Sequence, residues 1–359
     1  MTSERAARET AERIASLGLP GGDLETISVD DGHLGVLLSE LSNNRVLGLF
    51  VSGYESGAIE SVQAVVDEIT TAHDVVMSQT MRIEIAAIRV SRLLADAGID
   101  HRLLKGAALA HSVALSPSER SFRDVDLLVP ARQMSAAVAL LMGAGAHRLQ
   151  AELRPGYDER YGKSVTLRLD DVEVDLHRVL SPGPFGVWMQ PNDFFVLKES
   201  RSLGGVEIPT LDRTEHLVHA CYHVALGQRV PVLSNLRDIA LLAGTDDEPS
   251  YDVERFAETV TRWRGRAVVR RAVGLVQDRL DVELPTALRR FGQDPVDVGE
   301  LEAIEPYLTD DASGRFAALA PSTLRALPLL DRAGYALAVG LPDGARPADR
   351  VSALLKRWR

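Results

Sequence analysis

Two aspartates interrupt a short apolar stretch in the middle of the chain. The segment ERSFRDVDLLVP, residues 119–130, predicts a β-strand from Asp124 to Val129 that Pro130 terminates. Aspartate disfavours strands and is rarely buried without a partner. Alternate strand residues face the same side, so Asp124 and Asp126 project together while the aliphatic residues between them face a core. The fold must therefore place this strand between a core and a polar cleft.

Two carboxylates at close range repel each other unless a cation lies between them or one binds a proton. Mg²⁺ takes oxygen ligands, typically carboxylates together with substrate phosphates. A third carboxylate on a neighbouring strand would let two metal ions share the site. We therefore expect Asp124 and Asp126 to bind Mg²⁺ or Mn²⁺, and we look for a third aspartate elsewhere in the sequence.

The clearest hairpin in the sequence covers residues 163–180, KSVTLRLDDVEVDLHRVL. Apolar and polar residues alternate on both sides of a two-residue turn. This turn pairs Thr166 with Asp175, which places Asp175 in mid-strand on the polar face. Asp175 is the predicted third metal ligand. Asp171 or Glu173 would supply the third carboxylate if the register differed by one residue.

A strand-to-helix junction in LLKGAAL, residues 103–109, offers donors for phosphate groups. Gly106 allows close approach of the backbone, the following helix supplies N–H groups, and Lys105 adds a full positive charge. We therefore assign Lys105 and Gly106 to a triphosphate. Arg120, which precedes the predicted metal-binding strand, is expected to contact either a phosphate or Asp124.

The sequence predicts a small α/β core between mainly helical flanks. Apolar residues recur at helical spacing from residue 61 to residue 97, as one long helix or two broken ones. After a Pro/Gly linker at 181–186, helical patterns dominate. We divide the chain into a helical N-terminal arm (1–97), the core (98–182) and a mainly helical C-terminal domain (183–359).

Charge and composition narrow the class of protein. A formal net charge of −11 argues against nucleic-acid binding over much of the surface, although residues 262–271 hold five arginines in RWRGRAVVRR. The charged N-terminus and the lack of an apolar run of about 18 residues predict an intracellular, cytoplasmic protein with no membrane partner. The single cysteine, Cys221, excludes an intrachain disulfide and is expected to be a buried hydrophobe.

Three histidines require interpretation. His219 and His223 share a helical face, but no glutamate follows His219 and no third zinc ligand is evident, so packing is expected. His177 shares the face of Asp175 and is expected to form a hydrogen bond near the metal ligands. The sequence contains no Gly-x-Ser-x-Gly, Walker or Gly-x-Gly-x-x-Gly motif, which removes serine hydrolases, P-loop enzymes and Rossmann enzymes from consideration.

In their order along the chain, LLKGAALAHSV, RSFRDVDLLVP and VEVDLHRVL resemble the uncharacterised nucleotidyltransferase-like family of the DNA polymerase β superfamily. The second motif is carried by Arg120, Asp124 and Asp126, and the third by Asp175 and His177. The resemblance covers roughly residues 60–245 and extends to helices that carry His219, His223 and Asp238. It implies an α+β fold with a polymerase-β-type core, in which a mixed β-sheet is flanked by helices.

One position departs from the better-known members of that superfamily. Aminoglycoside nucleotidyltransferases have Gly-Ser where this chain has Lys105-Gly106, so Lys105 would have to hold the triphosphate by charge. A similar Lys-Gly turn occurs in nucleotidyltransferase toxins of the abortive-infection type.

The resemblance implies a metal-dependent nucleotidyltransferase that uses an NTP, ATP among them, and releases pyrophosphate. Acidic overall charge favours a small molecule, a peptide or a protein side chain as acceptor. The alternative enzymatic function is that of a toxin-like nucleotidyltransferase acting on tRNA. The alternative non-enzymatic function is that of a catalytically silent module that senses nucleotide, although such a module has no need of three converging carboxylates.

Overall fold

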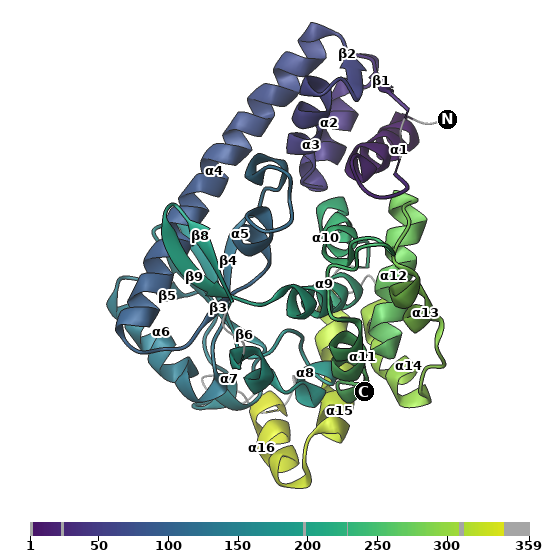
Figure 1. Ribbon diagram of the computed structural model, residues 1–359. Helices are drawn as coiled ribbons and strands as arrows, with labels where there is room; N and C mark the ends of the chain where they lie inside the picture. Colours follow the sequence, from purple (N-terminus) through teal and green to yellow (C-terminus); the bar gives the residue numbers. More distant parts are fainter. Residues whose placement is uncertain (1–2, 23–24, 197–198, 228, 309–311, 341–359) are drawn as a thin grey trace.

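The computed structural model describes residues 3–22, 25–196, 199–227, 229–308 and 312–340. A seven-stranded sheet lies near its centre, with helices on either side (Figure 1). The strands follow the order β5 (His147–Arg148), β6 (Ser164–Leu169), β7 (Val172–His177), β4 (Asp124–Leu128), β3 (Arg102–Leu103), β9 (Val206–Thr210) and β8 (Glu199–Leu203).

The sheet is mixed. β4 pairs with β7 in parallel and with β3 in antiparallel orientation, while β6 and β7 form an antiparallel hairpin. The predicted α+β class with a mixed sheet is therefore confirmed. The hairpin has the predicted register, with Thr166 opposite Asp175 and Leu169 opposite Val172. The sheet continues beyond residue 182 through the β8–β9 hairpin, and the three-part division of the chain stays a prediction.

Two helices cover the apolar face of the sheet. They are α4 (Gln63–Asp96) and α6 (Met134–Gly143), and α4 is the single long helix that extends along the sheet in Figure 1. Val125 and Leu127 of β4 are almost fully buried in this layer, together with Leu167 of β6 and Leu176 of β7. Burial of each such side chain contributes roughly 1.5–3 kcal/mol. The alternation seen in the sequence thus puts the aliphatic residues against helices and leaves the aspartates on the opposite face.

The N-terminal region contains more than helices. Between α1 (Ser3–Ser16), α2 (Leu34–Asn43), α3 (Leu47–Glu55) and α4, two strands pair in parallel, β1 (Ile27–Val29) and β2 (Ile59–Ser61). Each strand is three residues long, which is too short for an alternating pattern to predict it.

Helices dominate the rest of the chain. α5 (Lys105–Ala110), α7 (Tyr157–Arg160) and α8 (Phe185–Trp188) are short, and the longer helices follow β9. Those are α9 (Arg213–Leu226), α10 (Leu233–Ala243), α11 (Val253–Arg262), α12 (Arg266–Leu280), α13 (Thr286–Gln293), α14 (Val298–Ile304), α15 (Ala312–Ala326) and α16 (Leu329–Gly340). α9 begins at a reciprocal capping box, in which the Asp212 side chain accepts from the Glu215 backbone and the Glu215 side chain accepts from the Asp212 backbone.

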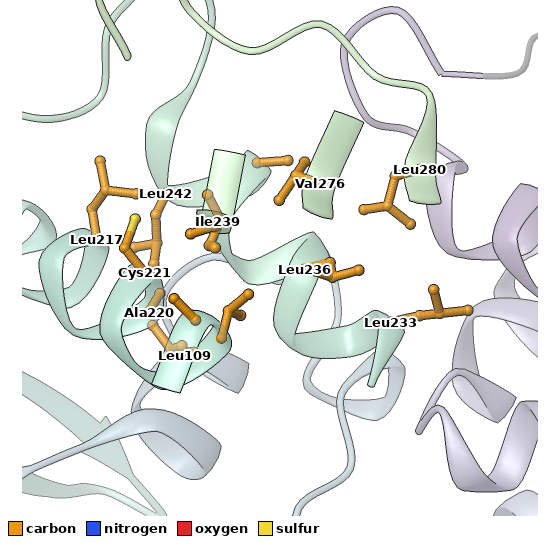
Figure 2. Close-up of a cluster of buried hydrophobic side chains, with 14 of the residues drawn as sticks. Leu109, Leu217, Ala220, Cys221, Leu233, Leu236, Ile239, Leu242, Val276 and Leu280 are labelled. Carbon is orange, nitrogen blue, oxygen red and sulfur yellow. The ribbon is translucent and has the colours of Figure 1, made fainter. Parts of the chain in front are cut away.

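A second core lies among α9, α10 and α12. Figure 2 shows Cys221 in this cluster, beside Leu217 and Leu242. Desolvation raises the pKa of the Cys221 thiol to about 12. Its thiolate fraction is therefore negligible at neutral pH, so Cys221 is a buried hydrophobe, as predicted. No described helix is both long enough and apolar enough to cross a membrane.

Candidate functional site

The parallel pairing of β4 and β7 brings two of the predicted aspartates side by side. Asp126 is in register with Asp175, and Leu128 is in register with His177. Ligand atoms of Asp126, Asp175 and His177 all lie within 4.8 Å of one another. Asp124 lies two residues before Asp126 on the same strand and faces the same side. The three predicted carboxylates therefore converge on the polar face of the sheet.

Asp126 is the most buried of these carboxylates and has two cationic or hydrogen-bonding partners. Lys105 Nζ lies 2.8 Å from Asp126 Oδ1, and His177 Nε2 lies 2.7 Å from the same oxygen. Burial by itself would raise the pKa of Asp126, but the charge of Lys105 and the hydrogen bond from His177 outweigh it. The pKa of Asp126 is therefore well below its usual value, and this carboxylate is ionised at neutral pH.

Asp124 is half-buried and titrates differently. Desolvation, followed by the charge of Asp126, raises the pKa of Asp124 to about 6, while Lys105 and Arg45 act in the opposite direction. A raised pKa in a carboxylate beside another carboxylate is the expected result when no cation separates them. A bound cation would favour the ionised form.

Asp175 has an unused acceptor. Its Oδ1 atom is buried and has no hydrogen-bond partner among the described residues. Of the two alternatives, Asp171 is in the exposed turn, while Glu173 lies in register with Asp124 and its carboxylate pairs with Arg168. An orphaned carboxylate oxygen beside a second carboxylate has the composition that a hard divalent cation requires, so Asp126 and Asp175 fit Mg²⁺ or Mn²⁺. Asp124 lies next to this cluster on β4 but does not belong to it.

The Lys-Gly turn lies beside these carboxylates. Lys105 adopts a left-handed backbone conformation with φ of 42°, which is unusual for a residue with a side chain. A Cβ atom at Gly106 would lie 3.0 Å from Cβ and Cγ of Phe122. A side chain at position 106 would therefore crowd Phe122, a reason for glycine that the sequence pattern did not indicate.

Arg120 has a partner that the sequence did not predict. Its guanidinium forms two hydrogen bonds with Asp238 of α10, at 2.7 and 2.6 Å, and donates a third to the Gly106 carbonyl at 3.1 Å. Both side chains are almost fully buried. The expected ion pair with Asp124 is absent from the described contacts of Arg120. Arg120 instead joins the Lys-Gly turn to α10.

Two further cations near the carboxylates were missed by sequence reasoning. Lys163 precedes β6, and its charge interacts with those of Lys105, Asp126 and Asp175; desolvation lowers the pKa of Lys163 to about 8. Lys163 shares the parity of the apolar residues of β6, so the period-two alternation does not indicate it as a polar-face residue. Arg45, between α2 and α3, interacts with Asp124 from a segment that carries no motif.

α9 brings His219 and His223 to the same region. Desolvation first, and then the charge of Lys105, holds the pKa of both histidines well below the usual value, so both are neutral at pH 7. His223 Nε2 lies 3.2 Å from Asn235 Nδ2, and the two imidazole rings are 6.3 Å apart. The metal-ligand cluster found among the described residues does not include them, in agreement with the expected packing role.

The sequence matches a family model over more than half of its length. Residues 33–281 match the model of a family described as uncharacterised nucleotidyltransferase. An antigenic nucleotidyltransferase-like protein from Paracoccidioides brasiliensis is 14% identical, with a TM-score of 0.36, and the alignment covers 62% of this chain and 96% of that one. The nucleotidyltransferase toxin MenT4 from Mycobacterium tuberculosis is 15% identical, with a TM-score of 0.29, over 79% and 98% of the respective chains. No curated protein matches the sequence.

Proposed function

The chain belongs to the uncharacterised nucleotidyltransferase family, and we propose that it transfers NMP from an NTP to an acceptor hydroxyl or phosphate, with release of pyrophosphate. The observation that carries this proposal is the register of β4 and β7, which sets Asp126 beside Asp175. Asp124 adds a third carboxylate two residues away on β4. A convergence of three like charges is unfavourable for the fold and is useful only where a cation or substrate compensates it.

Asp124, Asp126 and Asp175 would hold Mg²⁺ or Mn²⁺. Two such ions, when bound, neutralise charge on the transferring phosphoryl group and polarise the attacking and leaving oxygens. Side chains of the protein itself would bind and orient the triphosphate. Lys105, Lys163 and Arg45 surround the carboxylates with positive charge suited to a triphosphate. Such catalysis is mainly positioning and charge stabilisation.

In this proposal Arg120 positions the Lys-Gly turn and does not contact the substrate. Its buried ion pair with Asp238 and its hydrogen bond to the Gly106 carbonyl hold the Lys-Gly turn, so Lys105 remains directed at the site. Lys105 itself would move from Asp126 to the triphosphate when a divalent cation takes its place beside the carboxylate. Before metal and nucleotide bind, the charge of Lys105 reduces the free-energy cost of burying the carboxylates without a cation.

The acceptor that this proposal favours is a small molecule, a peptide or a protein, rather than tRNA. The arginine-rich segment was the main sequence support for tRNA. Arg262 pairs with Asp193, Arg266 pairs with Asp294, and Arg271 donates to the Tyr307 carbonyl. These contacts engage the guanidinium groups within the fold, which weakens the argument for a phosphate-binding surface.

Titration calorimetry tests the proposal. With Mg²⁺ present, at least one of ATP, CTP, GTP and UTP is expected to bind, and Asp124→Asn is expected to bind it more weakly. An Asp124→Asn protein that binds every NTP as well as the parent would show that the carboxylates do not serve nucleotide binding. A protein that binds nucleotide but never transfers label to any fraction of a cell extract would match the silent sensing module instead.

A further inference from the structure

We propose that a cavity between β6, α7 and the C-terminal helices α15 and α16 binds the acceptor, and that this acceptor is a small ring compound bearing hydroxyl groups and no net positive charge. The inference rests on the proposed function and names the substrate class of that site. The cavity has a volume of about 430 Å³. Pockets for small molecules span roughly 300–1,000 Å³, so one small molecule fills it and a folded macromolecule does not enter.

The three aspartates do not line the cavity, but two residues of its wall connect it to them. Lys163 contributes to its wall, and the charge of Lys163 interacts with those of Asp126 and Asp175. Thr166 also lines the cavity and is the cross-strand neighbour of Asp175. The polar face of the sheet therefore runs from the aspartates of β4, across β7, to the cavity at β6.

The order of strands decides which substrate the cavity receives. The Lys105-Gly106 turn, assigned above to the triphosphate, follows β3 on one side of β4. β7 and β6 lie on the other side of β4, and the cavity lies beyond them. In nucleotidyl transfer the attacking oxygen and the leaving pyrophosphate are in line on opposite sides of the α-phosphorus. With pyrophosphate leaving towards the turn, the acceptor oxygen would approach from the side of β7 and β6, which is the side on which the cavity lies.

The lining selects the kind of acceptor. Tyr157, Tyr161 and Tyr335 contribute to one wall, with ring centroids 5.8 and 5.5 Å apart in successive pairs. Ser164, Thr166 and Thr323 add hydroxyl groups. Aromatic surface beside hydrogen-bonding hydroxyls suits a ring that carries hydroxyl groups of its own.

Charge in the lining excludes a polycation. Arg148 and Asp158, which both line the cavity, pair with each other, and the remaining charged residue of the wall is Lys163. The net charge of the lining is therefore positive by one, and it favours a neutral or weakly anionic acceptor over a polycationic one. A hydroxyl group directed from such a ring towards Asp175 is the nucleophile that the reaction needs. Its oxygen would bond to the α-phosphorus as the bond to pyrophosphate breaks, and its proton would pass to the Asp175 carboxylate, whose Oδ1 atom has no other partner among the described residues.

An occluding variant tests the assignment. Ala151 is an exposed residue on the cavity wall, so Ala151→Trp fills the cavity without disturbing the core. Ala95→Trp, at an exposed position of α4 that does not line the cavity, is the matched control. Each protein is given Mg²⁺, an α-labelled NTP and a cell extract separated into small-molecule, RNA and protein fractions. NTP binding is measured separately by calorimetry, and thermal unfolding reports on folding.

We expect label in the small-molecule fraction, a loss of at least about tenfold in Ala151→Trp, and unchanged NTP affinity in both variants; tenfold corresponds to about 1.4 kcal/mol. Label in RNA or protein, transfer at the parent rate by Ala151→Trp, or NTP binding without label in any fraction overturns the inference. Weakened NTP binding in Ala151→Trp assigns the cavity to the nucleotide and overturns it equally. If the parent protein binds no NTP, the proposed function itself fails. Gln150→Trp, also exposed on the wall, replaces Ala151→Trp if that variant does not fold.

Discussion

Lys105 Nζ lies 2.8 Å from Asp126 Oδ1, so a cationic side chain already compensates the most buried carboxylate of the site. The lysine holds an unusual backbone conformation to do so. Lys105 and His177 both contact this oxygen, so a divalent cation bound through it would compete with the ammonium group. In the proposed site, metal binding and movement of Lys105 would be linked, and this linkage makes the role of the residue measurable.

The Lys105→Met variant separates the two proposed roles of Lys105, which are compensation of the Asp126 charge and binding of the NTP. We expect Mn²⁺ alone to bind the variant at least as tightly as the parent, because no ammonium group must leave Asp126. NTP affinity in the presence of metal should fall about 10–100-fold, since hydrogen bonds to charged groups contribute roughly 1.5–3 kcal/mol. Calorimetry with Mn²⁺ and then with NTP measures both. Arg201→Met on β8 is the control for a lost cation, and parallel losses of metal and nucleotide binding would contradict the proposed displacement.

Asp175→Asn should abolish transfer while leaving the fold intact. The Oδ1 atom of Asp175 has no hydrogen-bond partner in the described part of the chain, so the amide breaks no bond of that atom. We expect a thermal midpoint close to that of the parent and a rate of label transfer lower by about 100-fold or more, because a metal ligand is lost. EDTA should remove activity from the parent to the same extent. Asp170→Asn, in the exposed turn of the same hairpin and paired with Arg89, should remain active.

Asp238→Asn should destabilise the protein. It leaves the Arg120 guanidinium buried without its counter-ion, and removal of one partner from a buried pair costs about 3–5 kcal/mol of unfolding free energy. Urea denaturation measures this cost. Asp193→Asn, which breaks the exposed pair with Arg262, is the control and should cost about 0–1 kcal/mol. Equal effects of the two variants would refute the structural role assigned to Arg120.

The free energy of unfolding should decrease in mild acid because His216 is buried in its neutral form. Its Nε2 atom lies 3.0 Å from Thr210 Oγ1, and desolvation lowers the pKa of this buried histidine from 6.5 to about 3. Between these values the unfolded chain binds a proton at His216 that the folded chain does not. The free energy of unfolding is therefore highest above pH 6.5 and decreases as the pH falls, by up to about 1.4 kcal/mol per pH unit from this group.

Urea denaturation at several pH values between about 7 and 5 measures that slope. His216→Asn should reduce it, whatever the variant does to stability at neutral pH, because the titrating group is gone. His33→Asn, at an exposed position, should leave the slope unchanged. A slope in His216→Asn identical to that of the parent would assign the acid sensitivity to other buried groups.

Local patterns in the sequence were sufficient to predict the elements that carry the site. The period-two alternation around Asp124 and Asp126 predicted both the strand and the face that its aspartates occupy. The two-residue turn determined the hairpin register that pairs Thr166 with Asp175. Both features depend on residues close together in the chain, where side-chain direction follows directly from strand geometry.

The tertiary structure alone decided how those elements meet. Pairing of β4 with β7 set Asp126 beside Asp175, although about fifty residues separate them. It also gave Arg120 its partner Asp238 and brought Arg45 and Lys163 to the carboxylates from segments without a motif. Contacts across such separations depend on the packing of the whole chain and leave no periodic trace in the sequence. The sequence by itself thus determined which carboxylates share a face, and the fold determined which cations lie beside them.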